Sequence, residues 1–173
     1  MVKAIAYRTG QFLRALTARV SREEVTEALR LLTPEARALF HCQSIPDRRH
    51  GLAVYRMLLR AGYTNQHLLT AALLHDVGKA AAGLSVWHRV IIVLLRRFAP
   101  RLWACLSKGE PQGWRRPFII HARHAEIGAQ WAQEAGCSPL TVALIRRHQD
   151  LLTECQTEED RLLAALQAAD NAD

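Results

Sequence analysis

The sequence has little of what builds β-structure. Aromatic residues make up only 6% of its 173 residues, and long runs in which Val, Ile and Thr alternate with polar residues are absent, so strands are not expected. Leu and Ala, which are strong helix formers, dominate instead. Half of the residues are apolar, and a chain of this length can bury a sizeable core. The sequence therefore predicts an all-α protein.

Cysteine pairs and a signal peptide are also lacking. The four cysteines stand far apart and form no C-x-x-C pair, which argues against a zinc knuckle or a thioredoxin-like motif. Free thiols in a reducing cytoplasm are the interpretation that follows. Residues 1–20 are amphipathic and interrupted by Arg, without the apolar run of a signal peptide. We expect a cytoplasmic protein.

No apolar run is long enough to cross a membrane. The most apolar stretch, residues 90–106, is broken by Arg96-Arg97 and by Pro100, whereas a span needs about 20 apolar residues. A buried or partner-facing helix is expected here. Contact with a membrane surface, which Trp87, Trp103 and the flanking Arg residues would suit, ranks behind core packing or dimerisation.

Negative charge is scarce relative to positive charge. The chain carries 23 Lys and Arg against 16 Asp and Glu, a formal charge of +7. This excess favours anionic partners such as phosphates, nucleotides, nucleic acid or acidic lipid headgroups, and it is also consistent with a merely solvated basic surface.

Local signals place the helix boundaries. Ser21 with Glu24 forms a capping box, and Thr33 precedes Pro34 at a favoured first helical position. Helices are predicted at residues 4–20, from 21, from 33, and at 48–61, 65–79, 86–98, from 100, 118–135, 139–151 and 158–169. A break at 45–47 separates an N-terminal helical extension, residues 1–44, from a domain at 45–173. The extension is expected to pack on the core or to form the face of a homodimer.

The dipeptide His75-Asp76 is the first candidate for chemistry. It follows an apolar stretch of the predicted helix 65–79, and His and Asp are both ligands for divalent first-row metals. A carboxylate has two oxygens, so Asp76 can bridge two metals. Gly78 allows backbone or substrate to come close, and Lys79 can reach a phosphate as a point charge. Taken alone, such a pair also occurs by chance on protein surfaces.

The string ALLHDVGKA resembles the signature of the HD superfamily of metal-dependent phosphohydrolases. The segments around it resemble a two-metal branch of that family and extend over residues 48–170. The matching positions, in order along the chain, are His50 in RRHGLAVYRML, His75 and Asp76, His124 in HAEIGAQWA, His148 in ALIRRHQD and Asp170 in QAADNAD.

The resemblance implies a helical bundle of the HD-domain type, with extra N-terminal helices, that binds one or two divalent metals (Mn, Fe, Ni, Zn or Mg). One metal would be held by His50, His75, Asp76 and Asp170, and a second by Asp76, His124 and His148, with Asp76 bridging. A metal-activated water would hydrolyse a nucleotide or related phosphate ester. Asp76 and Lys79 would act in catalysis, and Lys79, Arg123 and Arg147 would bind the substrate phosphate.

The chain departs from the branch that degrades cyclic dinucleotides, because it has no G-Y-P motif and has Gln149 where that branch has a second His. The order of the candidate ligands, with a single His at this position, is closer to that of small bacterial enzymes that split dinucleoside tetraphosphates symmetrically. One alternative is a non-catalytic metal- or nucleotide-binding signalling module, which Gln149 motivates. Another is a basic protein acting at nucleic acid or a membrane surface, which leaves the His and Asp positions unexplained. His121 lies one helical turn before His124 and could face the same site, but a single His on a helix is more often a structural or exposed residue than a metal ligand.

Overall fold

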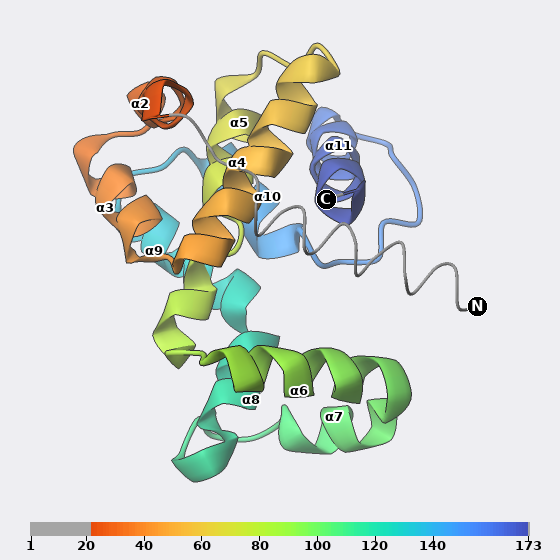
Figure 1. Cartoon of the computed structure of the whole chain (residues 1–173). Coiled ribbons are helices and arrows are strands. Elements are labelled where there is room, and N and C mark those ends of the chain that lie inside the picture. Colours follow the sequence, from red (N-terminus) through yellow and green to blue (C-terminus); the bar gives the residue numbers. More distant parts are fainter. Residues whose placement is uncertain (1–21, 173) are drawn as a thin grey trace.

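The computed structural model describes residues 22–172, and within them it contains ten α-helices and no strand (Figure 1). The all-α prediction is confirmed. The α-helices are α2 (Arg22–Arg30), α3 (Pro34–Cys42), α4 (Ile45–Arg60), α5 (Gln66–Leu74), α6 (Val86–Phe98), α7 (Pro100–Leu106), α8 (Arg116–Ala122), α9 (His124–Glu134), α10 (Pro139–Arg147) and α11 (Glu158–Ala172). Two 3-10 helices, η1 (Val77–Ala82) and η2 (Gly113–Arg115), complete the described part.

The core is built around α5, whose apolar residues from Leu68 to Leu74 are almost all buried. Helices α4, α10 and α11 pack against it. Helices α2 and α3, the described part of the predicted N-terminal extension, add Leu32 and Phe40 to the same core. Figure 1 shows α6, α7 and α8 grouped apart from this body, at the bottom of the view.

Capping residues begin several helices where the sequence predicts. Thr33 accepts a hydrogen bond from the amide of Ala36 at 3.2 Å, and Ser138 accepts one from the amide of Thr141 at the same distance. Each satisfies an amide that has no partner within its helix. The predicted helix 86–98 is confirmed, and so is the start of the next at Pro100. The predicted helix 4–20 and the Ser21 cap lie outside the described residues.

The predicted break at residues 45–47 is wrong, because these residues form the first turn of α4. Ser44 is the N-cap, and its side chain accepts from the amide of Asp47. Pro46 is tolerated in the first turn, where its missing amide proton would have no helical partner. The pattern therefore marks the start of α4, three residues before the predicted helix start at residue 48. The division into an extension, residues 1–44, and a domain, residues 45–173, stays a prediction.

Three other predicted helices end early or divide. The helix predicted at 65–79 stops at Leu74 and continues as η1, and the helix predicted at 118–135 divides at Arg123 into α8 and α9. The helix predicted at 139–151 ends at Arg147. All three changes lie beside residues of the candidate site. As a result, His75 and His124 stand at helix boundaries instead of in helix interiors.

Candidate metal centre

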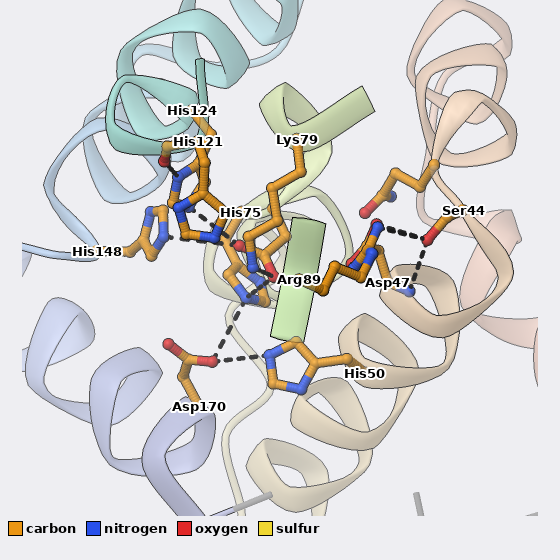
Figure 2. A network of polar contacts seen from close by, with 12 residues as sticks. Ser44, Asp47, His50, His75, Lys79, Arg89, His121, His124, His148 and Asp170 are labelled. Carbon is orange, nitrogen blue, oxygen red and sulfur yellow. Dashed lines mark hydrogen bonds and ion pairs between the residues drawn. The ribbon is translucent and has the colours of Figure 1, made fainter. Parts of the chain in front are cut away.

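All six predicted metal ligands converge, although they come from five separate parts of the chain (Figure 2). His50 lies in α4 and Asp170 in α11, whereas the others stand at the ends of α5, α9 and α10. They are His50, His75, Asp76, His124, His148 and Asp170. The sequence interpretation of these residues as one cluster therefore agrees with the geometry.

One half of the cluster joins α4, α5 and α11. Nε2 of His50 lies 2.7 Å from Oδ1 of Asp170, and Nε2 of His75 lies 3.5 Å from the same oxygen. Nε2 of His75 is also 3.6 Å from Oδ2 of Asp76. Ligand atoms of His50, His75 and Asp76 all lie within 4.8 Å of one another, so this group can hold a metal ion.

The other half uses the second oxygen of Asp76. Oδ1 of Asp76 lies 3.2 Å from Nε2 of His124 and 3.9 Å from Nε2 of His148. These three residues are buried and form a second group whose ligand atoms lie within 4.8 Å of one another. Asp76 therefore faces one group with each oxygen, as a bridging carboxylate would.

Three of the histidines are held in the same way by the main chain. Nδ1 of His75 donates to the carbonyl of Ala72 at 3.0 Å, and Nδ1 of His148 donates to that of Ile145 at 2.7 Å. His124 repeats the pattern with the carbonyl of its third preceding residue, at 2.5 Å. Donation from Nδ1 leaves Nε2 with a free lone pair, which is the state in which a histidine binds metal.

The atoms aimed into the cluster fit a metal. Nε2 of His75 and Nε2 of His148 are buried and have no hydrogen-bond partner among the described residues. A buried polar nitrogen without a partner costs about 1–3 kcal/mol, and coordination to a cation would remove that cost. Imidazole nitrogens together with carboxylate oxygens form a donor set suited to Mn, Fe, Ni or Zn.

Protonation states also favour cation binding. Burial, reinforced by the neighbouring His75, lowers the pKa of His148 to about 3. Burial alone would raise the pKa of Asp76, but Lys79 and the adjacent histidines outweigh it and hold that pKa well below its usual range. Burial would likewise raise the pKa of Asp170, but its hydrogen bond with His50 and the nearby His75 outweigh burial and lower that pKa. At neutral pH His148 is neutral and both carboxylates are ionised, as metal ligands must be.

A close contact between η1 and α9 brings the two halves together. A Cβ on Gly78 would lie 2.0 Å from the carbonyl oxygen of His124 and 2.8 Å from the amide nitrogen of Gly128. No side chain fits there, so the backbone after Asp76 lies directly against the helix that carries His124. The predicted close approach at Gly78 is thus an approach of backbone to backbone.

The three predicted phosphate-binding cations differ in position. Lys79 points at the cluster, where its Nζ contacts Oδ2 of Asp76 (Figure 2). Arg123 is exposed and donates to the carbonyl of Gly109, while Arg147 forms ion pairs with two carboxylates at the start of α11. The structure does not bring Arg123 and Arg147 into the cluster, and their binding of substrate stays a prediction.

A polar network beside Lys79 was missed by the sequence reasoning. Arg89 of α6 forms two hydrogen bonds to the buried carboxylate of Asp47, at 2.6 and 2.8 Å, and a third to Ser44. Its positive charge is also within electrostatic reach of Asp76. Because 42 residues separate Arg89 from Asp47, no local pattern predicts this pair.

His121 lies near the cluster but outside both groups. Its ring centroid is 5.3 Å from that of His124 and 5.8 Å from that of Trp103. Burial, with Lys79 nearby, lowers its pKa to about 3, so it is neutral at physiological pH. The structural role that the sequence favours for His121 fits these contacts.

A scan against protein-family models, a search of curated proteins and a search of solved structures give no match to this chain. The resemblance to the HD superfamily therefore stays a prediction, carried by the six convergent residues.

Proposed function

We propose that this protein is a metal-dependent phosphohydrolase of the HD type, which acts on a nucleotide or a related phosphate ester. The observation that carries the proposal is the pair of ligand groups sharing Asp76, with one carboxylate oxygen facing each group. The order of these ligands along the chain, which resembles the two-metal branch of the family, supports the same conclusion.

Divalent metals bound there would lower the pKa of a bound water and polarise a phosphoryl oxygen. The protein's own residues would hold and orient the reactants. His75, His124 and His148 have fixed ring orientations, which keeps the centre rigid. Lys79 stands against Asp76 and would neutralise a phosphate oxygen on that side. Arg89 supplies a second positive charge next to it, held in place by Asp47.

The first test is metal content together with turnover. Protein purified from cells supplied with Mn, Fe, Ni and Zn should contain at least one of these metals, and it should hydrolyse an aryl phosphate or a nucleotide. Asp76→Asn keeps the shape of the side chain but removes the charge that both groups share. We expect this variant to lose most of its metal and its activity.

A matched control separates this effect from a general loss of charge. Asp150→Asn removes an exposed carboxylate that contacts only Arg147 at 3.6 Å among the described residues. It should keep the metal content and rate of the wild type. If Asp76→Asn retains both properties as fully as Asp150→Asn does, the proposed function is wrong.

The second candidate, a non-catalytic module that binds metal or nucleotide, is favoured by Gln149. Its Nε2 lies 3.4 Å from Nε2 of His124, where an imidazole would offer another ligand. A panel of nucleotides with added Mn²⁺ distinguishes the two functions. Tight binding without turnover by the wild type would favour the module, and turnover gained by Gln149→His would trace the deficit to that position.

A further inference from the structure

The net positive charge of this protein comes from one segment. Residues 84–123, which include α6, α7 and α8, carry eight basic side chains and one acidic side chain. The whole chain carries 23 basic and 16 acidic side chains, so the remainder has 15 of each. The entire net charge of +7 therefore belongs to the segment that Figure 1 shows apart from the main body.

The same segment carries most of the exposed large apolar side chains. Eight of the twelve in the described residues lie in it, namely Trp87, Val90, Ile91, Val93, Leu94, Phe98, Leu102 and Trp114. Trp87 is 76% exposed and Phe98 is 69% exposed. Along α6 the apolar positions 87, 90, 91, 94 and 98 have helical spacing, so they form one continuous outward stripe. We call this stripe with Leu102 the apolar face of α6 and α7.

The basic side chains beside this face are available to a partner. Arg97, Arg101 and Lys108 are exposed, whereas Arg96, although exposed too, lies on the opposite side of α6 from the stripe and near His121. Of the eight basic residues in the segment, only Arg89 forms an ion pair with a carboxylate in the part of the chain that the structure describes. Arg97 also lies over the ring of Phe98, at 5.5 Å from its centroid, so apolar and basic groups interleave.

We propose that the apolar face of α6 and α7 binds the surface of a membrane rich in anionic lipids. Apolar side chains, including Trp and Phe, would insert at the level of the headgroups, and the flanking Arg residues would bind lipid phosphates. This inference does not depend on the proposed hydrolase activity. The region that carries the face adjoins the metal centre, because Arg89 of α6 reaches Asp47 and Trp103 of α7 contacts His121.

The charge distribution disfavours the other occupants. A second copy docked through the same face would bring two surfaces of net charge +7 together. The chain's own residues 1–20 contain four basic and no acidic side chains, so they too would be repelled. Nucleic acid matches the charge, and its bases can stack on Trp87 and Phe98, but it offers nothing apolar to cover Val90, Ile91 and Leu94. An anionic bilayer matches both features.

Binding at the surface fits the helix geometry better than insertion across the bilayer. Among the described residues no single helix is long and apolar enough to cross a membrane, and only the bent pair Gln66–Ala82 with Trp87–Phe98 passes by length and composition. Most of the first member of that pair lies in the protein core and carries His75 and Asp76. The second member alone has its apolar stripe turned outward.

The test is flotation of the full-length protein with vesicles of phosphatidylcholine alone or mixed with phosphatidylglycerol. We expect binding to the mixed vesicles, and much weaker binding to the neutral ones. The triple change Arg97→Gln, Arg101→Gln and Lys108→Gln should weaken binding about a hundredfold, since each basic group near an anionic surface contributes about fivefold. The double change Trp87→Ser and Phe98→Ser should abolish it.

Matched controls use exposed residues elsewhere on the protein. Arg30→Gln, Arg60→Gln and Arg161→Gln remove the same charge from α2, α4 and α11, and Leu151→Ser removes a side chain that is 96% exposed. Both controls should bind like the wild type. Because every changed side chain is exposed, unaltered circular dichroism should verify that the variants fold.

Three results would overturn the proposal. The first is equal binding by the control and test variants. The second is a dimer in sedimentation, without vesicle binding, that Trp87→Ser with Phe98→Ser dissociates. The third is salt-sensitive binding to duplex DNA by a protein that ignores mixed vesicles.

Discussion

Replacing Gly78 by alanine would test how the two halves of the candidate metal centre are brought together. The added Cβ would lie 2.0 Å from the carbonyl oxygen of His124. Ordinary contact begins near 3.4 Å, so α9 would have to move away by about 1.4 Å. The opposing atoms are backbone and cannot turn aside as a flexible side chain does. That shift would open the 3.2 Å approach between His124 and Asp76.

The magnitude follows from the cost of overpacking, about 1–3 kcal/mol, and we expect the upper end because backbone is displaced. For a chain of this size a loss of about 3 kcal/mol lowers Tm by roughly 6–12 °C. Mn²⁺ affinity should fall at least tenfold, since ligands displaced by about 1 Å no longer hold the geometry that a metal needs. Thermal unfolding and isothermal titration with Mn²⁺ measure the two effects.

Two further glycines give a graded comparison. A Cβ on Gly128 would lie 3.2 Å from its nearest neighbours, so Gly128→Ala should have smaller effects of the same kind. Gly109, at φ +96°, has open space around it, so Gly109→Ala should cost about 1 kcal/mol of backbone strain and leave Mn²⁺ affinity unchanged. If Gly78→Ala matches Gly109→Ala in both Tm and Mn²⁺ affinity, the contact does not organise the site.

Three shorter predictions concern the ion pair, a helix cap and the metal. Asp47→Asn should lower the free energy of unfolding by about 2–3 kcal/mol at pH 7. Burial raises the pKa of Asp47, but Arg89 and Ser44 outweigh burial and bring that pKa below 3.8. The carboxylate therefore stabilises the fold above pH 3.8, and the difference in unfolding free energy between wild type and Asp47→Asn should shrink as pH falls below that value. A difference in urea unfolding that stays constant with pH would contradict this. Ser138→Ala should cost about 1 kcal/mol, seen as a Tm lower by roughly 2–4 °C, with Mn²⁺ affinity unaltered. Chelation should lower the Tm of the metal-loaded wild type but not that of His148→Ala, whereas His41→Ala, at an exposed position, should respond as the wild type does.

Sequence reasoning succeeded where the signals are local. The helices after Thr33 and Ser138 begin where they were predicted, because each hydroxyl accepts a hydrogen bond from an amide that has no partner within its helix. Residue chemistry singled out His75 and Asp76, whereas His50, His124, His148 and Asp170 were expected from the resemblance to the HD superfamily. Their convergence needed only a helical bundle that brings α4, α5, α9, α10 and α11 together.

Sequence reasoning failed where tertiary contacts determine the helix ends and the ion pairs. Nothing in the sequence near residue 74 or residue 123 breaks a helix, since neither place has a proline, and the glycine at 78 comes several residues too late. The chain leaves α5 to place η1 against α9, and α8 ends to place His124 beside Asp76. The ion pair of Arg89 with Asp47 has the same origin, because it joins positions 42 residues apart.

The misplaced helix ends lie at the candidate metal centre for a physical reason. The last carbonyls of a helix have no amide partner within it. At the ends of α5, α8 and α10, the carbonyls of Ala72, His121 and Ile145 accept a hydrogen bond from the histidine three residues later. Each helix end thereby fixes one imidazole with Nε2 turned into the cluster, and its partial negative charge favours a nearby cation. A helix continued through residue 75 or 124 would use that carbonyl for its own hydrogen bond and leave the ring unfixed. The early helix ends are therefore part of how this fold presents its ligands.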